Sequence, residues 1–221
     1  MLGSHNNILP DLGPVYHETH LNRLIVEPFN AVSSLTMSLA ALLIWLLLIR
    51  KDYKSYPFLA FVYVPLIFIG GLGSTFYHAF RASSFFLYMD VMPVLLLSIL
   101  LSLFYWYKIY PNKFFIFIMA VLIILARGLP MIFFKGSAAI NISYLLSGML
   151  IIIPLAIFMF RTQFANWQEI AMSIGALLLA LFFRYIDDFD YLNLSMGTHW
   201  LWHVFSGVGV WFLGVYIYRT S

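Results

Sequence analysis

The sequence contains no cysteine, and this absence removes a whole group of possible sites. Disulfide bonds, thiolate nucleophiles and thiolate metal ligands are excluded, so any metal site must use His, Asp, Glu or backbone oxygen. Charge is also scarce, because Asp, Glu, Lys and Arg together make up only 10% of the 221 residues. Soluble globular domains carry about 25% charged residues, so the chain does not fit that class.

Hydrophobic residues, in contrast, make up 63% of the chain, and aromatic residues make up 19%. This composition predicts a protein whose main solvent is lipid. The 12 Lys and Arg residues exceed the 9 Asp and Glu residues by a net charge of only +3, and no basic run is dense. We therefore expect membrane lipids as the surroundings and no nucleic acid among the partners.

Seven apolar runs are long enough to cross a bilayer, whose hydrocarbon core of about 30 Å takes roughly 20 helical residues. The short connections predict antiparallel neighbours in one all-α domain, residues 1–221, with a polar N-terminal segment at 1–26. Arg127 and Pro130 in the fourth run indicate either a helix break or an intramembrane charge. The predicted spans are 29–49, 57–79, 84–107, 114–134, 138–160, 167–186 and 194–218.

Positive charges predict the orientation of this polytopic bundle. Arg50, Lys51 and Lys54 follow the first span closely, and the loops on that side hold more Lys and Arg than those on the other side. Lys and Arg accumulate in cytoplasmic loops, and the first loop counts most. We therefore expect a seven-transmembrane helix bundle with the N-terminus outside and the C-terminus inside.

Polar side chains inside the predicted spans are few, and each needs a partner or a function. Ser74 and His78 are four residues apart near the end of the second span, and His199 and His203 are four apart near the start of the last. Each pair therefore shares one helical face. Asp90 lies roughly two turns into the third span. In an antiparallel bundle all five residues come to the same membrane face, which the orientation makes the outer one.

This pattern predicts a catalytic zinc site. Two histidines four residues apart on a helix commonly bind zinc, and His78 adds a third ligand while leaving one position open to water. Zinc activates such a water for attack on a carbonyl. Asp90 is placed to accept the proton of this water, and Ser74 is placed to donate a hydrogen bond to the oxyanion or to the water itself. The expected reaction is hydrolysis of an amide or ester, and the depth of the site suits a lipid substrate. Singly, the histidines also fit interfacial contacts to headgroups, and Ser74 fits a small packing residue.

The same residues resemble a known family. Ser74-xxx-His78, then Asp90 and Pro93, then His199-xxx-His203 look like the alkaline ceramidases and, more broadly, the CREST superfamily of seven-helix membrane zinc hydrolases. The segment from Gly197 to His203 resembles the bacterial branch. The resemblance implies an enzyme of a bacterial inner membrane, or of an endomembrane if the protein is eukaryotic. This enzyme would cleave the N-acyl amide bond of ceramide or a related lipid. The resemblance also implies that His78, His199 and His203 bind zinc, with Asp90 and Ser74 on the zinc water.

Eukaryotic ceramidases also carry calcium in their acidic N-terminal segment. By that resemblance Glu18, Asn22 and Glu27 are the candidate calcium ligands, although their altered spacing favours an ordinary solvated loop. Two other functions fit the same residues: hydrolysis of another lipid linkage, and a receptor-like or structural bundle joined by a non-catalytic zinc. A fourth protein ligand on the metal would favour the structural alternative.

Overall fold

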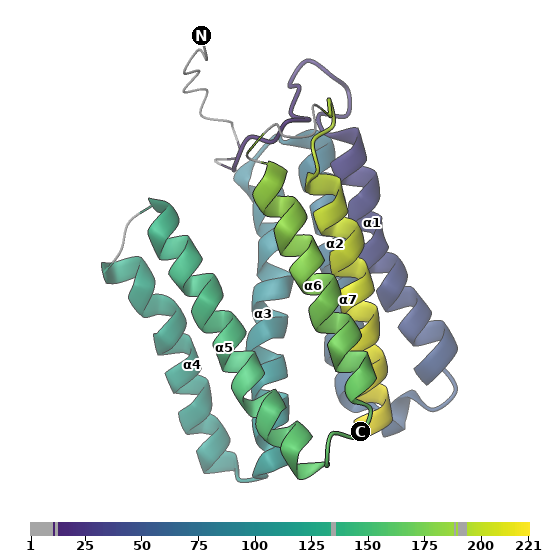
Figure 1. Cartoon of the computed structure of the whole chain (residues 1–221), viewed down its shortest axis with the longest axis vertical. Coiled ribbons are helices and arrows are strands. Elements are labelled where there is room, and N and C mark those ends of the chain that lie inside the picture. Colours follow the sequence, from purple (N-terminus) through teal and green to yellow (C-terminus); the bar gives the residue numbers. More distant parts are fainter. Residues whose placement is uncertain (1–10, 12, 134–135, 188, 190–193) are drawn as a thin grey trace. The chain divides into compact units, whose positions relative to one another are not determined.

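The computed structural model describes residues 11, 13–133, 136–187, 189 and 194–221, and over these residues the chain is all-helical, without strands (Figure 1). The all-α prediction is therefore confirmed. The α-helices, in chain order, are α1 (Pro28–Leu43), α2 (Val64–Phe80), α3 (Ser84–Ile109), α4 (Lys113–Phe133), α5 (Gly136–Arg161), α6 (Trp167–Asp187) and α7 (His199–Thr220).

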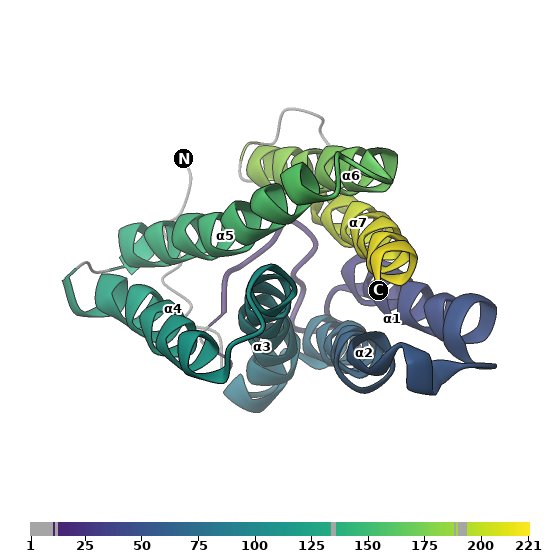
Figure 2. The same cartoon turned by 90° about the horizontal axis from the view of Figure 1, so that it is seen from below.

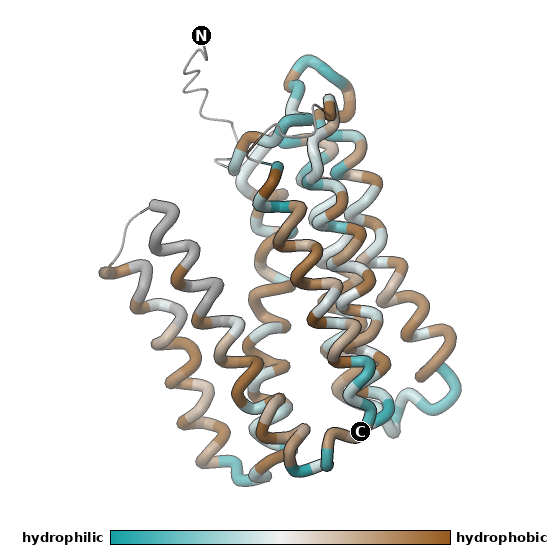
Figure 3. Tube along the Cα trace, in the orientation of Figure 1, coloured by the Kyte–Doolittle hydropathy of each residue, from teal (hydrophilic) through white to brown (hydrophobic). Residues whose placement is uncertain are grey.

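Within the described residues, five helical stretches are long and apolar enough to cross a membrane. Hydrophobic residues run along the helices, whereas hydrophilic ones gather in the loops and at the helix ends (Figure 3). The chain thus has the make-up of a membrane-embedded, multi-pass protein. The five stretches are Pro28–Ile49, Leu59–Phe80, Ser84–Ile109, Trp167–Asp187 and His199–Thr220, and shorter apolar segments lie at Lys113–Ala126 and Gly148–Arg161.

Local conformation refines two of the predicted spans. The fourth helix is continuous through Pro130 rather than broken there. The last helix begins at His199 rather than near residue 194, because Gly197 adopts a positive φ of 62° just before it. Asp187 Oδ1, from the end of α6, then accepts the backbone N–H groups of Thr198 at 2.5 Å and His199 at 3.0 Å. These are N–H groups at the start of α7, which have no acceptor within the helix.

The chain forms two compact units. The first consists of Met1–Val94 and Gln168–Ser221 and contains every candidate site residue, and the second consists of Leu95–Trp167. Within the second unit α4 packs against α5, and the Ser102 hydroxyl donates to the Leu150 carbonyl at 2.6 Å. The candidate site therefore lies entirely within the first unit.

In the first unit α1 packs against both α2 and α7 (Figures 1 and 2). Small side chains allow these helices to approach closely: Gly71 of α2 lies against Ser38 of α1, and Gly207 of α7 lies against Thr36 of α1. The Thr36 hydroxyl also donates to the His203 carbonyl at 2.9 Å. Membrane helices associate through such close packing and interhelical hydrogen bonds. The bond from Thr36 fixes the turn of α7 that carries His203.

Replacing Gly73 with alanine is expected to destabilise the first unit. Gly73 of α2 lies against the backbone carbonyl of Met89 in α3, so an added methyl group would meet backbone rather than a movable side chain. Overpacking of this kind costs roughly 1–3 kcal/mol. Thermal unfolding in detergent should show a lower midpoint for Gly73→Ala than for the control Gly175→Ala, whose methyl group meets open space. Equal midpoints would contradict the close approach of α2 and α3.

Candidate metal centre

Three histidines converge where α2 ends and α7 begins. One ligand nitrogen from each of His78, His199 and His203 lies within 4.8 Å of the others, and all three side chains are buried. The two Nε2 atoms of His78 and His203 are 3.1 Å apart. Nitrogens bound to one tetrahedral zinc at about 2.0–2.1 Å are roughly 3.3 Å apart, so this spacing suits a shared metal. The predicted convergence is confirmed, and the group could hold a metal ion.

The chemistry of the donors also fits a metal. The Nδ1 atom of His199 is buried, and no described residue is its hydrogen-bond partner. Buried polar atoms without partners are uncommon and require an explanation. Neutral imidazole is a borderline-soft ligand, which suits zinc and similar transition metals better than calcium or magnesium. The identity of the metal as zinc remains a prediction.

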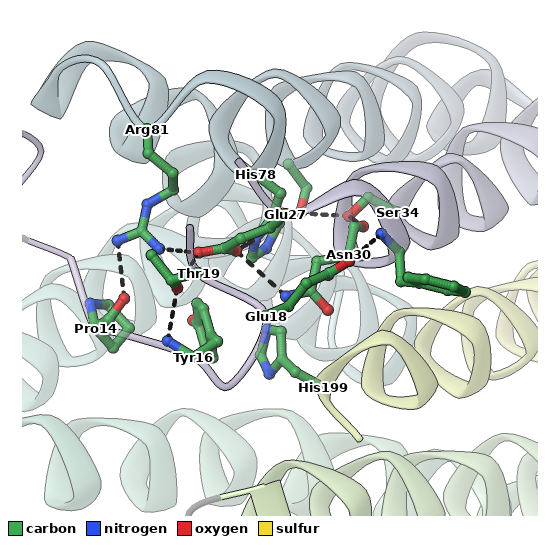
Figure 4. Close-up of polar contacts among 12 residues, drawn as sticks. Pro14, Tyr16, Glu18, Thr19, Glu27, Asn30, Ser34, His78, Arg81 and His199 are labelled. Atoms are coloured by element: carbon green, nitrogen blue, oxygen red, sulfur yellow. Dashed lines mark hydrogen bonds and ion pairs between the residues drawn. The ribbon is translucent and has the colours of Figure 1, made fainter. Parts of the chain in front are cut away.

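Glu27 has a role that the sequence analysis did not predict. Its Oε2 lies 2.5 Å from Nδ1 of His78, the ring nitrogen opposite the one that faces His203 (Figure 4). Asn30 Nδ2 donates to the same oxygen at 3.2 Å. A carboxylate in this position fixes the tautomer and the ring orientation of a metal-binding histidine. The position of Glu27, which opens the first span at the same membrane face as His78, was the signal that could have revealed this role.

Replacing Glu27 with glutamine is expected to weaken zinc binding by about 10–100-fold, because the partner that orients His78 loses its charge while every ligand remains. Competition with a chromogenic chelator measures the affinity. Glu169→Gln is the matched control, since Glu169 is also a buried carboxylate but pairs with Arg219 at the opposite ends of α6 and α7. Equal weakening in both variants would indicate general destabilisation instead.

Ser74 and Asp90 lie beside the histidines. Ser74 is buried one turn before His78 on α2, and Asp90 of α3 is half-buried and close enough to Ser74 and His78 to interact with both. The Ser34 hydroxyl donates to Ser74 Oγ at 3.0 Å, which links α1 to the same chain of groups. The structure therefore brings together Asp90, Ser74 and the histidine cluster. Ser34 is an additional member of the site.

The N-terminal segment 13–27, called the strap below, lies across the helix ends at the histidine cluster. The backbone N–H groups of Val26 and Glu27 donate to the carbonyls of Ala79 at 2.9 Å and His78 at 3.1 Å. The ring of Tyr16 stacks on His199 with a centroid separation of 3.9 Å. The strap is thus attached to α2 by its backbone and to α7 by a ring contact.

Two of the three candidate calcium ligands, Glu18 and Glu27, are acidic residues of the strap. Glu18 and Glu27 are buried, so the expectation of a solvated loop is wrong for both, whereas Asn22 is exposed. Glu18 caps α1, because its carboxylate accepts the N–H groups of Phe29 at 2.6 Å and Asn30 at 2.9 Å. Free N–H groups at a helix start attract a carboxylate in this way. The structure does not bring the three residues together as available oxygen ligands.

Arg81, the residue after α2, is a second member of the site that the sequence analysis missed. Its side chain is buried and forms an ion pair with Asp11 and another with Glu27. Figure 4 shows the pair with Glu27. Arg81 adopts the left-handed conformation with φ of 48°, which is uncommon for a residue other than glycine. The spacing of polar residues within spans gave no sign of it, since Arg81 lies just outside the second span.

The charge states around the strap follow from burial and from these contacts. Burial favours the neutral form of Glu27, but the hydrogen bond with His78 and the charge of Arg81 outweigh it and lower the pKa of the Glu27 carboxyl. Burial alone would lower the pKa of Arg81, whereas the hydrogen bond to Asp11 and the charge of Glu27 outweigh it and raise that pKa. Burial raises the pKa of the Tyr16 phenol. At neutral pH the carboxylate and the guanidinium are therefore charged, and the phenol is neutral.

Comparisons with protein families and with curated proteins found no match. Any functional conclusion therefore depends on the three histidines, on the Ser74 and Asp90 pair, and on the strap that lies across them.

Proposed function

We propose that the chain is a zinc-dependent intramembrane hydrolase that cleaves the N-acyl amide bond of ceramide or a related lipid. The observation that carries the proposal is a buried group of three imidazoles, from His78, His199 and His203, with Ser74 and Asp90 beside it. Structural zinc sites are usually closed by four protein ligands, whereas catalytic sites have three and keep a position for water. A group of three, among the described His, Asp and Glu residues, supports the catalytic alternative.

The chain's own residues divide the work of amide hydrolysis. Zinc, when bound, supplies an activated water and polarises the amide carbonyl. Asp90 accepts a proton from the attacking water and delivers it to the amine that leaves. Ser74, beside Asp90, orients its carboxylate, and Glu27 orients the ring of His78.

A lipid substrate is proposed because the site lies at the ends of apolar spans. His199 is the first residue of its span, and His78 lies close to the last residue, Phe80, of another. The amide of ceramide lies at a similar depth, between the polar headgroup and the acyl chains. The same proposal includes seven spans, an outside N-terminus and a site near the outer face of a bacterial inner membrane. Its support is the run of Arg50, Lys51 and Lys54 after the first span.

Release of fatty acid from fluorescent ceramides by the purified, zinc-loaded protein tests the proposal. Chelation of the metal should stop the release, and added zinc should restore it. The amidase proposal is wrong if the protein holds one zinc per chain and releases no fatty acid from any ceramide. Hydrolysis of ester-linked lipids alone would favour the second substrate class. Zinc binding without any lipid hydrolysis would favour a metal that only joins α2 to α7.

A further inference from the structure

The Arg81 guanidinium occupies the middle of a buried acidic group that links the strap to the end of α2. Its Nε donates to Asp11 Oδ2 at 2.5 Å. Its Nη1 pairs with Glu27, and its Nη2 donates to the Pro14 carbonyl at 2.8 Å (Figure 4). The ring of Tyr77 faces the guanidinium at 4.6 Å from its centroid. The planar fork of arginine suits several directed hydrogen bonds and a stacked ring at once. The side chain therefore has a built set of partners rather than a chance surface contact.

The carboxylates around Arg81 have little capacity left for another cation. Glu27 Oε1 accepts a hydrogen bond from Arg81 and a second one, 2.5 Å long, from the Thr19 hydroxyl. Glu27 Oε2 accepts hydrogen bonds from His78 at 2.5 Å and from Asn30 at 3.2 Å. A carboxylate offers about four acceptor positions, so those of Glu27 are all used. Calcium takes six to eight oxygen ligands in proteins. A calcium ion bound here would have to displace several of these buried bonds.

A buried acidic pair of this kind needs a positive charge. An unpaired carboxylate taken out of water is strongly unfavourable, and Asp11 and Glu27 are both fully buried. Arg81 supplies that charge from within the chain. A residue other than glycine keeps a left-handed backbone conformation when its surroundings hold it there, and the bonds to Asp11, Pro14 and Glu27 provide that hold.

We propose that Arg81 is a built-in cation that takes the place of the calcium ion implied by the ceramidase resemblance. It is a positioning residue: it clamps the strap onto α2 and holds Glu27 against His78, so that metal binding at the histidines needs no calcium. Pro14 of the strap and Asp11, two residues before the strap begins, contact this clamp, and Tyr16 links the strap to His199. Calcium-independent hydrolysis is the corresponding expectation, and that part rests on the proposed function.

The proposal is tested on the full-length protein in detergent by measuring zinc affinity with and without calcium. Wild-type affinity should be the same in EGTA and in excess calcium. Arg81→Met should weaken zinc binding by about 10–100-fold, as expected when a group that orients a metal ligand is lost. Arg81→Lys keeps the positive charge but not the planar fork of hydrogen-bond donors. Its zinc affinity should therefore lie between those of the wild type and Arg81→Met. Arg23→Met is the matched control, because Arg23 lies in the strap but is exposed, and it should bind zinc as the wild type does.

Hydrogen exchange of the strap amides separates clamping from simple folding. Arg81→Met should speed exchange at Val26 and Glu27, whose N–H groups bond to α2, while amides in the middle of α7 stay protected. Unchanged zinc affinity and unchanged strap exchange in Arg81→Met would overturn the proposal. So would a loss of wild-type zinc affinity on removal of calcium, a result that does not depend on any variant folding. None of these measurements involves hydrolysis, so a calcium-independent, zinc-binding protein that cleaves no ceramide would contradict the proposed function alone.

Discussion

Replacing His203 with alanine is expected to lower the zinc affinity of the chain by about 100-fold. Zinc bound by four protein ligands contributes about 10–16 kcal/mol, so one ligand is worth roughly 3 kcal/mol, or a factor of about 100 in affinity. The His203 side chain is buried, and its Nε2 faces that of His78 at 3.1 Å. The contact from Thr36 to the His203 backbone carbonyl does not involve the ring, so the packing of α1 against α7 should persist.

Metal analysis of purified protein, followed by chelator competition, measures this loss. Wild type should retain one zinc per chain, and His203→Ala should lose it at chelator concentrations that leave the wild type loaded. His20→Ala is the matched control, since His20 is an exposed histidine of the strap. Zinc retained at wild-type affinity by His203→Ala, or by the parallel variant His78→Ala, would show that the histidine cluster is not the metal site.

Replacing Asp90 with asparagine is expected to slow ceramide hydrolysis by about 100- to 10,000-fold, the usual contribution of a general acid–base group. Asparagine keeps the shape of the side chain and can still receive a hydrogen bond from Ser74, but it cannot accept a proton from water. Zinc content should not change, because Asp90 is not among the three clustered ligand residues. The expected result is therefore an inactive protein that still holds its metal.

Fatty-acid release and zinc content need to be measured on the same preparation. Asp52→Asn serves as the control, because Asp52 is exposed in the connection after the first span. If Asp90→Asn hydrolyses ceramide within tenfold of the wild type, another group accepts the proton. If it loses zinc, the Asp90 carboxylate acts on the metal site itself, and the proposed separation between ligands and proton acceptor is wrong.

The convergence of the histidines could be predicted because it depends on regular geometry. The spacing of His199 and His203 puts both on one face of a helix, and the order of antiparallel spans brings the start of α7 to the same side as the end of α2. The lengths of the apolar runs similarly placed most helix ends within a few residues. Regular elements follow from periodic patterns, and those patterns are visible in a sequence.

The strap could not be predicted, because its conformation depends on individual contacts between distant residues. Glu18 caps a helix that begins ten positions later in the chain, and Arg81 reaches back to Asp11. No periodic pattern marks either contact. The acidic residues therefore suggested metal ligands or a solvated loop. Their partners are instead backbone N–H groups, one guanidinium, and the side chains of Thr19, Asn30 and His78. The left-handed conformation of Arg81 is equally invisible in the sequence.

The position of the strap has a practical consequence for preparing the protein. A polyhistidine tag at the N-terminus would precede the strap by only 12 residues of sequence, and its imidazoles would compete for the metal being measured. The C-terminus follows α7, whose 22 residues span about 33 Å from His199. Purification handles placed there, and removed before metal analysis, keep foreign ligands a full membrane helix away from the native ones.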